Sequence, residues 1–235
     1  MIMRKAAAAL AASCTVIIKP SPETPLSVLA LVELAQQAGF ANGVLNVLTT
    51  NMQGTPEVSE ALCKHDLERK VTFTSSTAIR SLIARHCSYG LKKLTLELDG
   101  NCSFLVFDDG DLNSALNALM ILKWRTASQA CSHANRIYVQ SGTTMGPLTT
   151  PRGIKKLERL IKDACSKGAV VKTGGRRPFA FTKGNFFEPT VISGMMSDML
   201  ASREEIFGPL LCLYRFETEE EAVKAVNATS MGLAS

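Results

Sequence analysis

The first hundred residues alternate between two patterns of apolar and polar positions. Short apolar or β-branched runs predict strands, and longer stretches with apolar residues three and four positions apart predict helices. The expected strands are residues 15–18, 44–48, 70–74 and 93–98, and the expected helices are residues 6–12, 26–38, 56–63 and 77–87. Strands that alternate with helices through short links indicate a parallel sheet with right-handed crossovers. The unbroken β-branched run at 15–18 further predicts a strand buried on both faces.

The same alternation starts again in the second half of the chain. It predicts strands at 104–107, 137–140, 169–172, 187–192 and 210–216, helices at 111–127, 153–167 and 219–229, and a loop at 202–209. We therefore expect an α/β protein with two open parallel-sheet, Rossmann-like domains, residues 1–99 and residues 100–235.

Composition and charge limit the kinds of partner. The 235 residues are 46% hydrophobic and carry a formal net charge of +5. The densest basic cluster, residues 172–177, has no aromatic or basic stripe beside it, so we read it as a solvated loop and expect no nucleic-acid partner. No apolar run reaches the length of a membrane span, so we expect no membrane partner. Residues 1–12 could pass for a short signal peptide, but their alanine-rich run is barely hydrophobic, and we favour a buried helix.

The cysteines and histidines argue against a metal site and against a disulfide framework. The seven cysteines form no Cys-x-x-Cys pair, their number is odd, and only three histidines accompany them. This usage is typical of a reducing compartment and predicts an intracellular protein.

Two loops carry candidate catalytic groups. Cys131 follows an expected helix and precedes an expected strand, and Glu97 lies at the end of another strand. A thiol and a carboxylate in such loops can serve as nucleophile and general base. On spacing alone, however, the simpler interpretation stands first, in which Cys131 is a buried small hydrophobe.

Two strand ends carry groups that suit a nucleotide. Lys19 and Ser21 follow the strand at 15–18, and residues 74–77 are hydroxyl-rich and open a helix. Open parallel sheets bind nucleotides at the carboxyl ends of their strands, and a helix N-terminus suits phosphate. The alternative for residues 74–77 is an ordinary Ser/Thr helix cap.

Taken together, the motifs resemble the aldehyde dehydrogenase superfamily. Five segments match the family in its order along nearly the whole chain: residues 14–21, 73–77, 96–101, 129–131 and 204–209. Residues 1–5, 123–125, 183–190 and 216–222 are most similar to the succinate-semialdehyde subfamily. The resemblance implies an oxidoreductase that converts succinate semialdehyde, or a related small aldehyde, to the acid. Cys131 would attack the aldehyde to give a thiohemiacetal, and Glu97 would activate water against the resulting thioester.

The resemblance also implies a cofactor site for NAD or NADP, with the choice between them left open. Lys19 matches the lysine that holds the adenosine ribose, with Ser21 beside it, and Ser76 falls at the family's pyrophosphate contact. Glu205 and Phe207 match residues that position the nicotinamide ribose and ring.

Two arginines are implied in substrate binding. Arg4 and Arg125 match arginines of the semialdehyde subfamily that would pair with the distal carboxylate of the substrate. An arginine fork matches the planar geometry of a carboxylate, so it can select an acid semialdehyde.

Several departures from the family pattern accompany these matches. The chain has about half the family's length, so we expect both domains to be incomplete, without the oxyanion-hole asparagine and without the C-terminal segment through which family members form homo-oligomers. A further piece is expected to be absent between residues 142 and 143. Ser75, Asp99 and Ser128 stand where the family has glycine.

These departures keep two alternatives open beside the enzyme. One is an inactive truncated paralogue, and the other is a module that binds nucleotide or a full-length partner. The compartment, mitochondrial matrix or cytoplasm, is also open.

Overall fold

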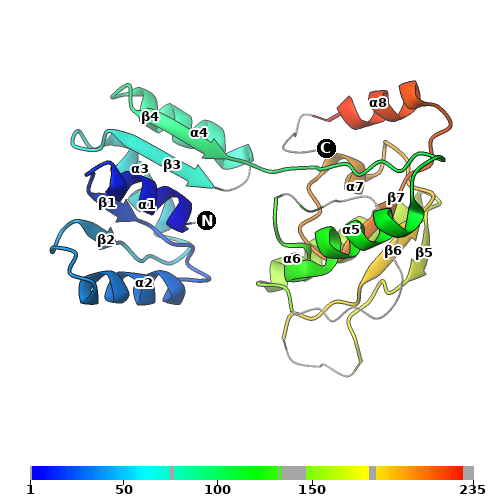
Figure 1. Ribbon diagram of the computed structural model, residues 1–235, viewed down its shortest axis with the longest axis horizontal. Helices are drawn as coiled ribbons and strands as arrows, with labels where there is room; N and C mark the ends of the chain where they lie inside the picture. Colours follow the sequence, from blue (N-terminus) through cyan, green and yellow to red (C-terminus); the bar gives the residue numbers. More distant parts are fainter. Residues whose placement is uncertain (1, 75–76, 132, 134–146, 180–183, 230–235) are drawn as a thin grey trace. The chain divides into compact units, whose positions relative to one another are not determined.

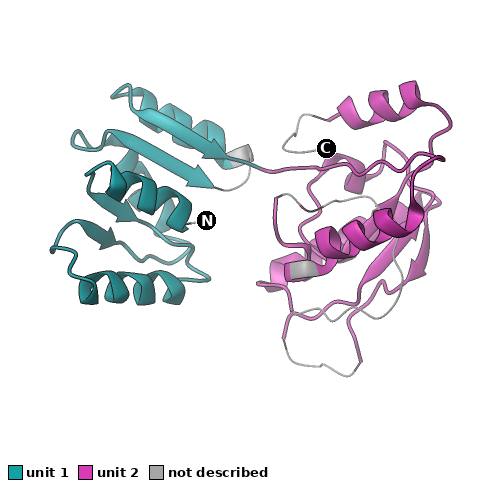
Figure 2. Ribbon diagram, in the orientation of Figure 1, with its two compact units in different colours: residues 1–98 teal, residues 99–235 magenta. Residues whose placement is uncertain are grey.

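The computed structural model describes residues 2–74, 77–131, 133, 147–179 and 184–229, and the statements below concern these residues (Figure 1). The chain divides into two compact units, Met1–Leu98 and Asp99–Ser235 (Figure 2). Each unit is an open α/β assembly with parallel strand pairs, as the sequence pattern predicts. The roles expected for them, cofactor binding for the first and thiol chemistry for the second, stay predictions.

The first unit alternates helices and strands in the predicted order. Its elements are α1 (Ile2–Ala11), β1 (Val16–Ile18), α2 (Leu26–Gln37), β2 (Leu45–Val47), α3 (Thr55–Lys64), β3 (Lys70–Thr74), α4 (Thr77–Ser88) and β4 (Lys93–Glu97). Strand β1 pairs with β2 and β3 pairs with β4, both in parallel. Each pair is joined through a helix, as a parallel connection requires.

Two small cores hold the first unit together. Ala6, Ile18 and Val28 join α1, β1 and α2 in one core, and a second core joins α3 and α4 to β3 and β4. The expectation that residues 15–18 are buried on both faces is wrong, because Ile17 is 41% exposed while Ile18 is buried. A β-branched run indicates a strand but does not show which of its faces other elements cover.

The second unit builds a three-stranded sheet. Its elements are α5 (Leu112–Trp124), the 3₁₀ helix η1 (Arg125–Ser128), α6 (Pro151–Ser166), β5 (Val170–Thr173), β6 (Thr190–Ser193), α7 (Leu200–Arg203), β7 (Leu210–Leu213) and α8 (Glu219–Asn227). The strand order is β5-β6-β7, with β6 and β7 parallel and β5 antiparallel to β6.

Helices cover both faces of this sheet. Ile192 and Leu210 share a core with Leu160 and the rest of the apolar face of α6, whereas Val191 and Leu211 pack against α5. Successive strand residues point to opposite faces, so the alternation along β6 and β7 accounts for the two cores.

Several predicted elements differ from the structure; the helix expected at 6–12 begins at Ile2, and the strand expected at 210–216 ends at Leu213. Residues 104–107, expected as a strand, have no regular secondary structure, and the helix expected at 111–127 ends at Trp124. The strand expected at 187–192 begins at Thr190. The strand expected at 137–140 lies outside the described residues. None of the described helices is long and apolar enough to cross a membrane.

Candidate active site

Cys131 lies just after an unusual turn. Thr126, Ala127 and Ser128 have φ angles of 53°, 52° and 57°, so three consecutive residues with side chains adopt the left-handed conformation. This conformation places Cβ too close to the following carbonyl oxygen, which is why only glycine adopts it routinely. The resemblance implies glycine at position 128, and the backbone conformation of Ser128 is one that favours glycine. Ser128 is fully buried, and its Oγ has no hydrogen-bond partner among the described residues.

Gln129 and Cys131 both follow this turn and are held by hydrogen bonds. Gln129 Oε1 accepts hydrogen bonds from the backbone N–H and the hydroxyl of Thr149, both at 3.2 Å. Cys131 is a half-buried free thiol, and its carbonyl oxygen accepts from the Sγ of Cys102 at 3.2 Å. His133 is buried, with Nδ1 3.2 Å from the carbonyl oxygen of Ala130.

The turn at residues 99–102 connects the thiol loop to a second predicted segment. Besides the contact of Cys102, Gly100 N–H donates to Glu205 Oε1 at 3.2 Å and Asn101 Nδ2 donates to the carbonyl oxygen of Ser202 at 3.3 Å. The turn thus brings the loop of Cys131 and the segment that carries Glu205 into one region of the second unit.

Glu205 and Phe207 lie between α7 and β7. Burial raises the pKa of the Glu205 carboxyl. The hydrogen bond from the Gly100 N–H lowers this pKa, and the nearby Asp99 carboxylate raises it further. Phe207 is 38% exposed. The neighbouring Glu204 forms an ion pair with Arg159 of α6, with Nη1 and Oε1 2.9 Å apart, which fixes the course of this segment.

In the first unit, Glu97 is the last residue of β4 and is half-buried. It is paired in register with Thr74 at the end of β3. Lys5 on α1 donates a hydrogen bond to the Thr74 hydroxyl. Burial lowers the pKa of Lys5, while the nearby Glu97 carboxylate acts in the opposite direction. Lys5 was not singled out from the sequence, because it is one of two adjacent basic residues and its approach to Glu97 depends on the packing of α1.

Lys19, Ser21 and Arg4 complete the described candidates of the first unit. Lys19 follows β1 directly, its Nζ lies 3.1 Å from the carbonyl oxygen of Pro20, and burial lowers its pKa. Ser21 is exposed, and its Oγ accepts from the Glu23 N–H at 3.3 Å. Arg4 is exposed on α1. Ser76 and the side chain of Arg125 lie outside the described residues.

The structure adds one buried cation that the sequence analysis did not select. Lys123, in the last turn of α5, is 0% exposed, and its Nζ has no hydrogen-bond partner among the described residues. Burial lowers its pKa to about 7. The available signal was a single charge inside the apolar run at 116–124.

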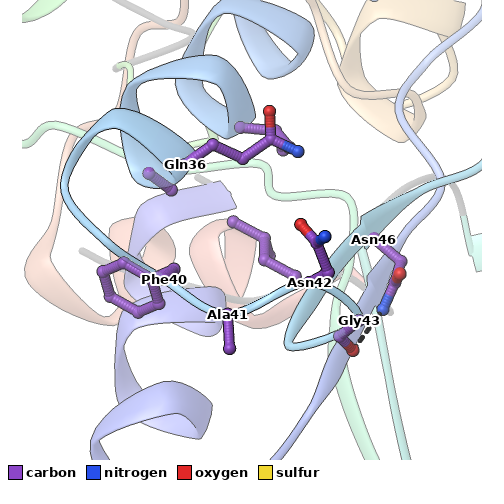
Figure 3. Close-up of a pocket in the computed structure, with 9 residues that line it drawn as sticks. Gln36, Phe40, Ala41, Asn42, Gly43 and Asn46 are labelled. Atoms are coloured by element: carbon purple, nitrogen blue, oxygen red, sulfur yellow. Dashed lines mark hydrogen bonds between the residues drawn. The ribbon is translucent and has the colours of Figure 1, made fainter.

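A surface pocket of about 240 Å³ lies elsewhere in the first unit, along α2 and the loop to β2 (Figure 3). Gln36, Phe40, Asn42 and Asn46 are part of its lining, and Asn46 donates to the Gly43 carbonyl oxygen at 2.8 Å. No predicted site residue and no ionisable side chain lines this pocket, so we do not consider it a candidate active site. Within the described part of the chain, no group of three or more His, Cys, Asp or Glu side chains could hold a metal ion.

Comparison with known proteins gives a consistent result. The model of the aldehyde dehydrogenase family matches residues 1–144 and 140–235. The mitochondrial succinate-semialdehyde dehydrogenase of Mus musculus is 41% identical, and the glutarate-semialdehyde dehydrogenase of Pseudomonas putida is 42% identical; the alignments cover the whole of this chain and 49% and 53% of those proteins. The crystal structure of an NADP-dependent enzyme of E. coli superposes with a TM-score of 0.92 at 39% identity, over 99% of this chain and 53% of that one.

The chain thus spans about half the length of the curated relatives it matches. The two matched segments of the family model meet at residues 140–144, next to the position where the sequence analysis expects a piece of the family pattern to be absent. Because the matched segments run along all of the sequence, the chain belongs to the aldehyde dehydrogenase family.

Proposed function

We propose that the chain carries the chemistry of an NAD(P)-dependent aldehyde dehydrogenase that oxidises a small aldehyde with a distal carboxylate, such as succinate semialdehyde. The single observation that carries the proposal is the placement of Cys131. Its half-buried free thiol follows a strained left-handed turn, and the turn at residues 99–102 contacts both the Cys131 loop and the segment that carries Glu205. Strained backbone is concentrated at functional sites, where the surrounding structure holds it in place.

The reaction begins at the Cys131 sulfur. Its thiolate attacks the aldehyde carbon to form a thiohemiacetal. NAD(P), when bound, would supply the hydride acceptor that this carbon needs to reach the oxidation level of a thioester. A thioester on Cys131 remains. Glu97 takes a proton from water, the hydroxide adds to the thioester carbon, and the acid leaves as the thiolate is restored.

Each unit, taken by itself, has side chains that suit part of a dinucleotide. Lys19 and Ser21 follow the carboxyl end of β1, where open parallel sheets bind nucleotides. Glu205 presents a carboxyl group whose second oxygen can accept from ribose hydroxyls while Oε1 holds the Gly100 N–H. NAD and NADP both remain candidates.

The substrate class rests on the family relationship. The mouse and Pseudomonas relatives are named for succinate and glutarate semialdehyde, which share an aldehyde at one end and a carboxylate at the other. Arg4 and Arg125 are the proposed partners of that carboxylate.

The test compares turnover of succinate semialdehyde with turnover of butyraldehyde, which has the same carbon count and no carboxylate. Cys131→Ala should abolish turnover of both, whereas Cys165→Ala, at an exposed free cysteine on α6, should leave it unchanged. Arg125→Ala should lower kcat/KM for the semialdehyde by about tenfold to a hundredfold more than for butyraldehyde, the usual size of a lost charged hydrogen bond. Turnover that survives Cys131→Ala, or equal losses for both aldehydes with Arg125→Ala, contradicts the corresponding assignment.

A nucleotide-binding protein without turnover is the second candidate. It is favoured by Ser128 and Asp99, which introduce strain and an extra carboxylate where the family has glycine. Binding of NAD or NADP with no oxidation of either aldehyde would establish this second function and overturn the first.

A further inference from the structure

The segment that carries Glu205 contacts a carboxylate at a position where the resemblance implies glycine. The side chain of Asp99 is hydrogen-bonded to the carboxyl group of Glu205. The next residue donates its N–H to Glu205 Oε1 at 3.2 Å, and Asn101 holds the carbonyl of Ser202. Three successive residues of the turn at 99–101 therefore form hydrogen bonds with the segment that carries Glu205.

A hydrogen bond between two carboxyl groups requires a proton on one of them. Two ionised carboxylates in contact repel each other, so such pairs retain one proton to a higher pH than an isolated acid does. The other groups that face Glu205 are few. Lys156 of α6 favours the ionised form of Glu205, and the Gly100 N–H does the same. The neighbouring Arg159 is engaged by Glu204. Burial, the largest influence, favours the neutral form.

We propose that Asp99 is a positioning residue that shares a proton with Glu205 and thereby makes the binding of the nicotinamide ribose pH-dependent. This inference rests on the proposed function, in which Glu205 meets the ribose. While the proton is shared, Glu205 is occupied by Asp99. When the proton leaves to solvent, Glu205 becomes a full acceptor for ribose hydroxyls, and charged acceptors form the stronger hydrogen bonds. Dinucleotide affinity should therefore rise with pH.

The experiment measures the dissociation constants of NAD and NADP by equilibrium dialysis from pH 5 to pH 8, for the wild-type chain, Asp99→Gly and Asp99→Asn. Variants are compared at the same pH, so that titration of the 2′-phosphate of NADP, near pH 6, cancels. The wild-type chain should bind about tenfold more tightly at pH 8 than at pH 5, the size of one charged hydrogen bond. In Asp99→Gly the rise in affinity should move to lower pH, because burial still favours the neutral form of Glu205 but the second carboxylate is gone. Asp99→Asn, which can hydrogen-bond to Glu205 but adds no charge, should show the same move to lower pH.

A second readout needs no nucleotide. Carbon-13 NMR of carboxyl-labelled Glu and Asp follows the titration of Glu205 directly, with Glu205→Gln identifying its signal. In Asp99→Gly that signal should titrate at a lower pH than in the wild-type chain. An unchanged midpoint overturns the shared proton, and an unchanged pH profile of binding overturns its link to the cofactor. If the NMR midpoint moves but neither dinucleotide binds at any pH, the proton is shared and the proposed function fails.

Discussion

Replacing Lys123 should stabilise the chain at neutral pH. Lys123 is 0% exposed, and its Nζ has no hydrogen-bond partner among the described residues. A buried ammonium without partners carries a desolvation penalty of several kcal/mol. Lys123→Met keeps the unbranched aliphatic stem, removes the amine and places a flexible apolar end in the same space. The fold should therefore retain the packing of α5 and lose only the charge.

The pKa of Lys123 sets the size of the effect. Burial lowers it from the usual 10.5 to about 7 in the folded chain. Each pKa unit corresponds to about 1.4 kcal/mol, so the shift corresponds to about 5 kcal/mol of folding free energy. The sign follows from the proton balance. Between pH 7 and pH 10.5 the unfolded chain binds the proton and the folded chain does not, so stability rises with pH across this window. Below pH 7 both states are charged and the full penalty applies.

The assay is urea denaturation followed by tryptophan fluorescence. Trp124 is the chain's single tryptophan and is buried beside Lys123, so its emission reports unfolding of the second unit. At pH 7 we expect Lys123→Met to raise the free energy of unfolding by about 2–5 kcal/mol, with the advantage shrinking toward zero near pH 10. Lys162→Met, at an exposed lysine on α6, is the matched control and should follow the wild-type pH dependence.

Two results would refute this reasoning. If the wild-type chain and Lys123→Met show parallel stability curves between pH 7 and pH 10, the amine is not an unpaired buried group. If Lys123→Met is strongly destabilised at pH 7, the ammonium makes interactions that outweigh its desolvation, as a paired buried charge does.

Two further predictions concern backbone conformation. Ser128→Gly should raise the free energy of unfolding by about 1–3 kcal/mol in the same assay, because it removes a strained φ of 57° and a buried hydroxyl without a described partner; a destabilised variant would contradict this. Gly174→Ala should lower it by more than about 2 kcal/mol, since a Cβ there would lie 2.3 Å from the Pro189 carbonyl oxygen. Gly168→Ala has a similar positive φ but no atom within 4 Å of its Cβ, so it should cost only about 1 kcal/mol, and equal losses at both positions would show that the clash is absent.

Local sequence predicts an element well where a few adjacent residues are enough to determine it. The strand at 70–74 and the start of the helix at 77 agree with the observed bounds, because a β-branched run and a helix start are set within a few residues. The strand at 104–107 fails for the opposite reason. Its apolar residues include Leu105 and Phe107, which are 38% and 43% exposed, and no ladder forms with a described strand. An apolar run becomes a strand only where a partner strand is available.

The candidate site residues also fall into two groups, those found from short motifs and those found only from the packing. Cys131 and Glu97 were selected from short motifs, and the structure positions each in a loop or at a strand end, as expected. Lys5 and Lys123 were not selected, because their importance arises from groups far away in sequence. A short motif records which side chains are present, whereas desolvation and pairing depend on long-range packing.

The replaced glycines show how far a sequence resemblance can be taken. The resemblance implies that Ser128 and Asp99 both replace glycines beside the proposed catalytic residues, and it does not distinguish between them. In the structure they differ in kind. Ser128 has a positive φ, so its side chain adds strain that glycine would avoid, whatever that side chain contacts. Asp99 is not among the positive-φ residues, and its effect is electrostatic, through the carboxyl group of Glu205. Ser128→Gly should therefore change mainly stability, and Asp99→Gly mainly the pH at which Glu205 ionises. If Ser128→Gly left the free energy of unfolding unchanged, the strain assigned to Ser128 would be wrong. If Asp99→Gly left the ionisation of Glu205 unchanged, the electrostatic role of Asp99 would be wrong.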